Sequence, residues 1–238
     1  MATIGDNLQA VRKRIAAAAR AAGRDPAAIT LLAVSKTHPA ARVVEAIAAG
    51  QRAFGENYVQ EAVHKMDAIA EGSAQAIALE WHLIGPLQSN KTRVVAERFD
   101  WVQTIDRQKI AERLSAQRPE THAPLNVLVQ VNVSGEASKS GVEPQVALEL
   151  AQAVARLPRL RLRGLMAIPE PTDDAALQRT RFHVLRELLE AAQARGLVLD
   201  TLSMGMSDDM EAAIAEGATM VRIGTAIFGA RERAQTVA

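Results

Sequence analysis

Short apolar runs alternate with amphipathic segments along most of the chain, and this alternation is what most restricts its fold. The predicted strands cover residues 31–36, 52–55, 80–84, 101–104, 125–133, 162–168, 198–202 and 220–223. The segments between them have helical spacing, and several end at glycine, as helices usually do. Strict alternation favours a parallel sheet, and eight such units are typical of a closed (β/α)8 barrel. An open doubly wound sheet is the alternative.

Length and apolar content fit a single domain. The chain has 238 residues, of which 48% are hydrophobic, so one core over residues 1–238 is expected. Apolar spacing near the start predicts a helix over residues 4–22, followed by a barrel over about residues 30–229. There is no linker or low-complexity tract that would separate a second domain.

Charge and composition restrict the classes of function. The formal net charge of +1 argues against nucleic acid or an acidic membrane surface as a partner. The absence of cysteine excludes disulfides and cysteine-ligated metals, and the histidines lack metal-ligand spacing, so no metal site is expected. No run approaches the roughly 20 apolar residues that span a bilayer, and the start lacks the apolar centre of a signal peptide. We therefore expect a cytoplasmic protein.

Lys36 ends the apolar run LLAVSK, in which Leu32, Val34 and Lys36 share one face of the first predicted strand. An amine beside apolar surface loses hydration, which favours its neutral, nucleophilic form. Lys36 is thus a candidate for Schiff-base formation with an aldehyde or ketone. The alternative is that it marks the strand end and extends into water.

The last predicted strand, in MVRIGTAIFGAR, is interrupted by a charged residue, Arg222. Met220, Arg222 and Gly224 share one face by alternation, and a guanidinium in such surroundings needs an acceptor. Gly224 and Thr225 open a predicted helix whose backbone N–H groups and hydroxyl suit an anion such as phosphate. The upstream segment SMGMSDD adds Ser203, Gly205 and Ser207 at a second strand-to-helix turn. Together with Lys36, these turns describe a ligand that carries both an aldehyde and a phosphate.

Several motifs occur in order between Leu31 and Gly229: LLAVSKTHP, FGENYVQEA, WHLIGPLQSNK, VNVSGEASKSG, LRGLMAIP and LSMGMSDDMEAAIAEGATMVRIGTAIFG. They resemble the YggS/PROSC family of pyridoxal phosphate homeostasis proteins. That family looks like the barrel of alanine racemase, a fold-type III pyridoxal phosphate (PLP) protein, without the racemase's second, β-rich domain. The resemblance implies that Lys36 forms the Schiff base with PLP and that Arg222 faces the pyridine nitrogen. It implies phosphate contacts from Ser207, Gly224, Thr225 and Ser203.

The function implied by the resemblance is that of a non-catalytic PLP carrier or buffer that supports vitamin B6 and amino-acid homeostasis. Acceptor apo-enzymes would be its partners, and we expect a monomer. An arginine leaves the pyridine nitrogen unprotonated, which weakens PLP as an electron sink. The chain has one tyrosine, Tyr58, and nothing after residue 229 is expected to supply the racemase's opposing tyrosine base. A PLP-dependent racemase and a Schiff-base aldolase-like lyase remain alternatives.

Three further residues near the expected site each have two possible roles. Asn57 could hydrogen-bond the cofactor ring or cap the helix that follows it. His38 could exchange protons with the imine or serve only the structure of its loop. Lys139 could reach the barrel mouth and attract phosphate, or it could be a solvated loop charge.

Overall fold

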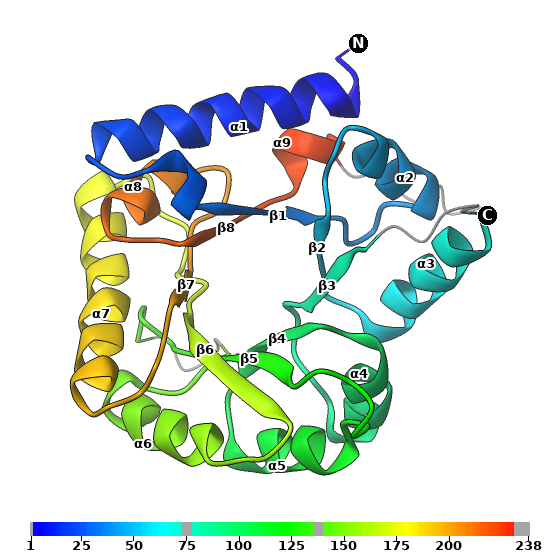
Figure 1. Ribbon diagram of the computed structural model, residues 1–238. Coiled ribbons are helices and arrows are strands. Elements are labelled where there is room, and N and C mark those ends of the chain that lie inside the picture. Colours follow the sequence, from blue (N-terminus) through cyan, green and yellow to red (C-terminus); the bar gives the residue numbers. More distant parts are fainter. Residues whose placement is uncertain (1, 73–77, 136–139, 231–238) are drawn as a thin grey trace, which may run out of the picture.

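The computed structural model describes residues 2–72, 78–135 and 140–230. Within these ranges, eight parallel strands pair in the order β1-β2-β3-β4-β5-β6-β7-β8 and close into a barrel (Figure 1). Closure comes from β1, which pairs with both β2 and β8. The prediction of a (β/α)8 barrel is therefore confirmed, and the open sheet is excluded.

The strands are β1 (Thr30–Val34), β2 (Ala53–Glu56), β3 (Glu80–Leu83), β4 (Trp101–Ile105), β5 (Leu125–Gln130), β6 (Leu160–Met166), β7 (Thr201–Ser203) and β8 (Met220–Ile223). The α-helices are α1 (Ile4–Ala21), α2 (Ala40–Ala48), α3 (Val59–Gly72), α4 (Thr92–Arg98), α5 (Gln108–Gln117), α6 (Pro144–Ala155), α7 (Ala175–Ala194), α8 (Met210–Ala215) and α9 (Thr225–Phe228). Short 3-10 turns at Pro26–Ala28 and Ser89–Lys91 precede β1 and α4.

The first helix completes the outer ring of helices. The helices after β7 and β8 are short, with six residues in α8 and four in α9. α1 packs against both of them and against α2, and it crosses the outside of the barrel beside β8 and β1 (Figure 1). Asn7 on α1 donates from Nδ2 to the carbonyl of Ile227 on α9 at 2.9 Å. The helix expected over residues 4–22 thus covers the part of the barrel that the short helices α8 and α9 leave uncovered.

Several strand ends differ from the expected ranges. The first strand ends at Val34, so the prediction that Lys36 lies within it was wrong. Lys36 instead stands in a turn, because the next residue, Thr37, has a left-handed φ of 66° that an extended strand cannot contain. The strand expected at residues 198–202 is β7, which starts at Thr201, where pairing with Gly164 of β6 begins.

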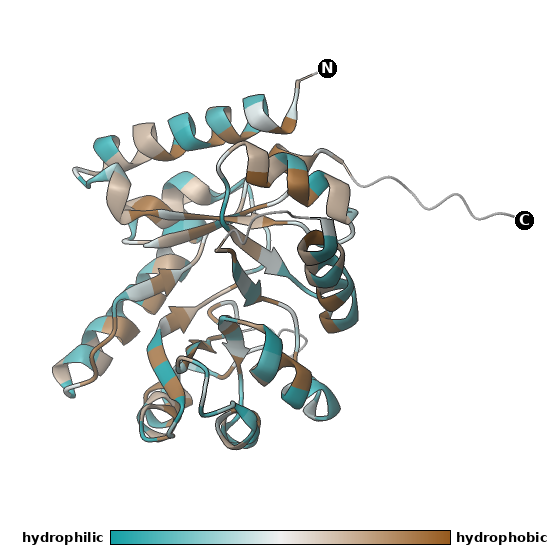
Figure 2. Cartoon of the chain, turned by 45° about the vertical axis from the view of Figure 1, so that its right-hand side comes forward, coloured by the Kyte–Doolittle hydropathy of each residue, from teal (hydrophilic) through white to brown (hydrophobic). Residues whose placement is uncertain are grey.

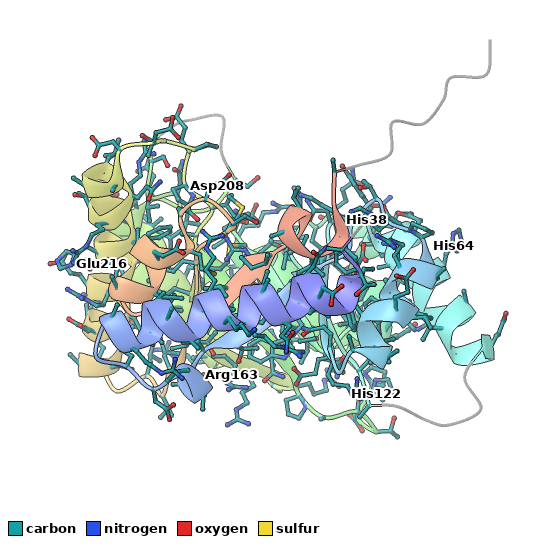
Figure 3. The ribbon with its side chains drawn as sticks, turned by 90° about the horizontal axis from the view of Figure 1, so that it is seen from above. His38, His64, His122, Arg163, Asp208 and Glu216 are labelled. Atoms are coloured by element: carbon teal, nitrogen blue, oxygen red, sulfur yellow. The ribbon has the colours of Figure 1, made fainter. Side chains whose placement is uncertain are left out.

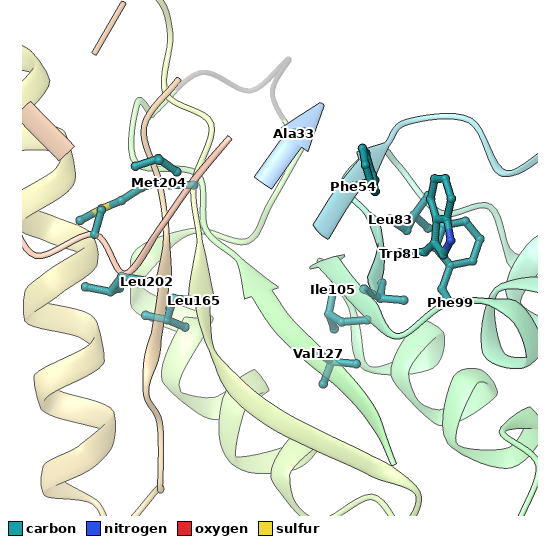
Figure 4. Packing of buried hydrophobic residues seen from close by; sticks show 14 of the residues in the cluster. Ala33, Phe54, Trp81, Leu83, Phe99, Ile105, Val127, Leu165, Leu202 and Met204 are labelled. Atoms are coloured by element: carbon teal, nitrogen blue, oxygen red, sulfur yellow. The ribbon is translucent and has the colours of Figure 1, made fainter. Parts of the chain in front are cut away.

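The main hydrophobic core lies between the sheet and the surrounding helices. Phe54, Trp81, Leu83 and Phe99 pack together in this layer (Figure 4). Alternate strand residues point outward into it, and the helices turn their apolar sides towards the barrel and their polar sides outward (Figure 2). This layer buries most of the apolar surface and leaves the barrel interior free for other groups.

The interior of the barrel contains two small apolar clusters. One comprises Leu32, Val34, Ala53, Ile84 and Met220, and the other Trp101, Leu128 and Met166. Fully buried polar side chains from β3, β4 and β7 share the interior, namely His82, Gln103 and Ser203. Because buried polar groups are costly unless they are hydrogen-bonded, their partners indicate what they do.

Candidate functional site

The carboxyl ends of the strands open at one end of the barrel, where enzymes of this fold carry their active sites. His38, after β1, and Asp208, after β7, lie on one side of α1 in the view of Figure 3, and Arg163 and His122 lie on the other. β1 pairs with β8 in a register that sets Leu32 beside Arg222. The turn after β1 and the turn after β8 therefore leave neighbouring strands at the same end.

Lys36 is half-buried in the turn that follows β1. The preceding residue, Ser35, is fully buried, and its backbone N–H donates to the carbonyl of Gly55 on β2 at 3.0 Å. Gly224, at the start of α9, packs closely on the same strand end, since a Cβ atom there would lie 3.2 Å from the carbonyl oxygen of Val34. Lys36 and the candidate phosphate turn are thus brought together at the point where the barrel closes.

Arg222 is held inside the barrel with 3% of its surface exposed. Its Nη1 donates to Oγ of Ser203 at 2.9 Å and its Nη2 to the carbonyl of Ala167 at 2.8 Å. Burial lowers the pKa of Arg222 to about 10, against an opposing influence of Asp209, so the guanidinium stays charged at neutral pH. The two bonds supply the acceptors that the sequence led us to expect.

A chain of hydrogen bonds continues from Arg222 across the interior. Ser203 Oγ donates to Oε1 of Gln103 at 2.6 Å, and Gln103 Nε2 lies 2.9 Å from Nδ1 of His82. The ring of His82 stacks on that of Trp101, with centroids 5.1 Å apart. The hydroxyl of Ser203 is therefore engaged with Arg222 and Gln103 and supports Arg222. Its role as a phosphate contact stays a prediction.

A small pocket of about 150 Å³ opens at the same end of the barrel. Asn57 lines it after β2, and its Oδ1 is buried without a hydrogen-bond partner among the described residues. The loop after β3 lies against Asn57 so closely that a Cβ atom on Gly85 would be 2.2 Å from the Asn57 carbonyl oxygen. The pocket is also lined by Ile84, Pro86, Thr104, Gln130, Ser140 and Ile168. An unsatisfied amide oxygen beside a cavity indicates a place for a polar ligand group.

The three remaining candidates for phosphate contact lie in the turns after β7 and β8. Ser207 is half-buried, and its carbonyl accepts a hydrogen bond of 2.7 Å from Arg14 on α1. Gly224 is the N-cap residue of α9, and Thr225 is exposed at the first position of that helix. In (β/α)8 barrels, the loops after strands 7 and 8 are the usual place for a phosphate. Their roles as phosphate contacts stay predictions.

The other candidates have different surroundings. The ring of His38 stacks on that of Phe228 in α9, with centroids 5.2 Å apart, which links the turn after β1 to the turn after β8. Tyr58 is 57% exposed. Lys139 lies outside the described residues. Across the part of the chain that is described, no group of three or more His, Cys, Asp or Glu side chains could hold a metal ion. No helix there is long and apolar enough to cross a membrane.

Some residues of this region were not foreseen from the sequence. Gln103 supports Ser203 inside the barrel, and Thr104 donates from Oγ1 to the carbonyl of Gly85 at 2.9 Å. The sequence feature that could have indicated them is the pair of polar residues inside the otherwise apolar run WVQTI, because a polar residue in a buried strand needs a hydrogen-bond partner. The partners themselves are distant in sequence and could not be read from it.

The closed (β/α)8 barrel of this chain is the class of barrel found in alanine racemases. The family described as "Alanine racemase, N-terminal domain" matches residues 7–232. The alanine racemase of Corynebacterium glutamicum superposes with a TM-score of 0.70 at 20% identity over 96% of this chain. This chain covers 63% of that racemase, so the likeness shows a shared barrel.

Two curated relatives are much more similar. The "Pyridoxal phosphate homeostasis protein" of Pseudomonas aeruginosa is 62% identical over 232 residues, 98% of this chain and 97% of the relative. The protein of the same name from Escherichia coli is 60% identical over 235 residues, 98% of each chain. PipY of Synechococcus elongatus, solved with PLP bound, has a TM-score of 0.81 at 37% identity and covers 95% of this chain and 100% of its own. The chain belongs to the alanine racemase N-terminal domain family and, within it, to the pyridoxal phosphate homeostasis proteins.

Proposed function

We propose that the chain is a non-catalytic PLP-binding protein that carries or buffers PLP and supports vitamin B6 and amino-acid homeostasis. The observation that carries this proposal is the pairing of β1 with β8, which sets the turn of Lys36 beside the strand of Arg222. Relatives at 60% and 62% identity bear the name of PLP homeostasis proteins, and a relative in the same fold binds PLP.

The described residues suit each part of PLP. Lys36 offers an amine for the aldehyde, and Arg222 offers a charged donor for the pyridine nitrogen. Ser207, Gly224 and Thr225 offer hydroxyl and backbone N–H groups for the phosphate. Oδ1 of Asn57, which has no hydrogen-bond partner among the described residues, offers an acceptor to a polar ring substituent at the pocket. A buried polar atom without a partner is rare, which supports the proposal that a polar ligand group binds there.

The same residues argue against turnover. Bound PLP supplies an electron sink when its ring nitrogen is protonated. Arg222 can only donate at that position, and its bonds to Ser203 and Ala167 hold it in place, so it keeps the nitrogen unprotonated. None of the seven residues that line the described pocket is titratable, and Tyr58 is largely exposed. The residues that line the described pocket thus offer contacts to PLP but no acid or base.

A carrier must also release what it binds, and we infer that acceptor apo-enzymes in the cytoplasm receive the cofactor. A Schiff base suits this role because it is hydrolysed reversibly, so transfer needs no separate energy source. A monomer with an open barrel mouth would leave Lys36 accessible for transfer. Mixing the loaded protein with a PLP-dependent apo-enzyme tests this step through recovery of the enzyme's activity, with free PLP at the same concentration as the reference.

The purified protein should be yellow, and borohydride reduction should bleach it and leave the mass of reduced PLP on Lys36. The loaded protein should show no appreciable racemase, transaminase or decarboxylase turnover across the amino acids. Robust turnover that depends on Lys36, at about 1 per second or faster, would overturn the proposal in favour of an enzyme. A colourless protein that traps only a phosphorylated carbonyl substrate would instead indicate an aldolase-like lyase.

A further inference from the structure

Lys65 on α3 is a buried charged residue that the ligand contacts do not explain. α3 packs outside β2 (Figure 1), and the Lys65 side chain is 5% exposed, although lysine is almost never so buried unless it is paired. Its Nζ donates to the carbonyl of Ser35 at 2.7 Å, to Oε1 of Glu56 at 2.8 Å and to Oε1 of Glu61 at 2.6 Å. Three acceptors occupy the three N–H groups of the ammonium, so Lys65 is not itself available as a nucleophile.

These contacts fall on both sides of Lys36. On its N-terminal side, the Ser35 carbonyl accepts from Lys65, and the Ser35 hydroxyl donates to Oε1 of Glu56 at 2.6 Å. On its C-terminal side, the backbone N–H of Thr37 donates to Oε1 of Glu61 at 2.5 Å. Lys65, Glu56 and Glu61, which we call the Lys65 cluster, therefore hold the two residues that flank Lys36.

The turn between these anchors is strained. Thr37 has a φ of 66°, in the left-handed region that β-branched residues rarely adopt. Such a conformation persists only when its surroundings enforce it, and the bond to Glu61 is one of the contacts that do so. The conformation of this turn decides the direction in which the Lys36 side chain leaves the backbone.

Burying the charges of the Lys65 cluster costs desolvation free energy, so the cluster needs a structural reason. Glu56 is fully buried. Burial raises the pKa of its carboxyl, while the charge and hydrogen bond of Lys65 and the hydroxyl of Ser35 act to lower it. Buried ion pairs often add little net stability over apolar residues of similar size, but they do define one geometry. In this position, the geometry that they define is that of the turn at Lys36.

We propose that Lys65 is a positioning residue for Lys36, acting through the backbone on both sides of it. The proposal rests on the proposed function, in which Lys36 forms a Schiff base with PLP. A reacting group misplaced by about 1 Å can lose a large part of its reactivity, so a loosened turn should impair imine formation while the phosphate turns after β7 and β8 remain intact. Lys65 thus affects recognition of the aldehyde and leaves recognition of the phosphate unchanged.

The test compares PLP with pyridoxine 5′-phosphate, which has the same phosphate and a hydroxymethyl group in place of the aldehyde. Lys65→Met should weaken PLP binding at least about tenfold and slow the growth of imine absorbance. Its affinity for pyridoxine 5′-phosphate should stay within about twofold of wild type. Lys13→Met, at an exposed lysine on α1, is the matched control and should change neither affinity.

Because Lys65→Met removes the partner of a buried carboxylate, its fold must be checked by circular dichroism and thermal unfolding. Glu61→Ala is the second variant, since the Glu61 side chain is 28% exposed and its loss removes the anchor of Thr37 more gently. It should show the same selective loss of PLP affinity. Folded variants that bind PLP as wild type does, or that lose both ligands equally, would overturn the proposal. A wild-type protein that gives no imine absorbance would instead contradict the proposed function.

Discussion

Gln103 Nε2 lies 2.9 Å from Nδ1 of His82 inside the barrel, and this contact fixes the protonation of the imidazole. Arg222 can only donate to Ser203, and the Ser203 hydroxyl then donates to the Gln103 carbonyl oxygen. The Gln103 amide nitrogen therefore faces His82 as a donor, so Nδ1 must accept and carries no proton. His82 is neutral in the folded protein, with its proton on Nε2.

The first prediction concerns the pH dependence of stability. Burial lowers the pKa of His82 below its ordinary value of 6.5, although Glu80 opposes this shift. Between the folded pKa and 6.5 the unfolded state binds more protons, so the free energy of unfolding should fall as the pH falls below 6.5. The loss is at most about 1.4 kcal/mol per pH unit for one proton.

Urea unfolding of wild type and His82→Gln at several pH values measures this contribution. The carbonyl of the new glutamine can still accept from Gln103, and it does not titrate, so the variant should lose less stability between neutral and mildly acidic pH. His122→Gln, at an exposed histidine, is the control and should behave as wild type. Parallel pH profiles for wild type and His82→Gln would show that the histidine is not held neutral.

The second prediction is that Lys36→Ala abolishes the imine absorbance of the PLP-loaded protein while the fold survives. Lys36 is half-buried in a turn beyond the strand, so its truncation leaves the main hydrophobic core and the interior apolar clusters intact. Absorbance spectra and the mass after borohydride reduction measure the effect, and circular dichroism checks the fold. Retained absorbance would assign the imine to another lysine, of which Lys139 would be tested next.

The third prediction concerns Arg222. Arg222→Glu should shift the spectrum of bound PLP, because a carboxyl group beside the pyridine nitrogen allows its protonation. The glutamate would also face the Ala167 carbonyl that now accepts from the arginine, so stability should fall and must be measured. Arg222→Gln, which retains a donor, is the gentler variant. A folded Arg222→Glu protein whose spectrum equals that of wild type would contradict the assigned contact.

The fourth prediction tests the phosphate turns. Ser207→Ala and Thr225→Ala should each weaken PLP binding by roughly 1 to 3 kcal/mol, the usual range for a hydrogen bond to a charged group. Pyridoxal, which lacks the phosphate, should bind poorly to wild type and respond little to either change. Titration of both ligands by absorbance separates the cases. If pyridoxal affinity falls by the same factor, these residues shape the pocket without contacting the anion.

The fold was predictable because its signals are local. Alternating apolar runs place each strand, and the charged Arg222 within an apolar strand predicted a guanidinium that needs acceptors, which Ser203 and Ala167 provide. The Lys65 cluster was not predictable, although Glu61 and Lys65 stand four residues apart on one helix face. Lys65 donates to the backbone carbonyl of Ser35, and Glu61 accepts from the backbone N–H of Thr37. These groups come within reach only when α3 packs against the barrel.

Similarly, the sequence suggested that Ser203 was an anion contact, because serine before a helix start is typical of such sites. The structure also gives Ser203 a hydrogen-bond partner, Gln103, that is 100 positions away in the chain, and closure of the barrel brings β4 and β7 close enough for this contact. Contacts of this kind depend on closure and not on local spacing.

Closure at β1 and β8 also has a consequence for synthesis. Lys36 follows the first strand and Arg222 lies in the last, so during synthesis the lysine leaves the ribosome long before Arg222, Gly224 and Thr225 are made. The proposed ligand site is therefore complete only when β8 pairs with β1 and closes the barrel. A ligand that contacts both the first and the last strand binds only the closed barrel, so its binding stabilises the closed barrel relative to every partly assembled form.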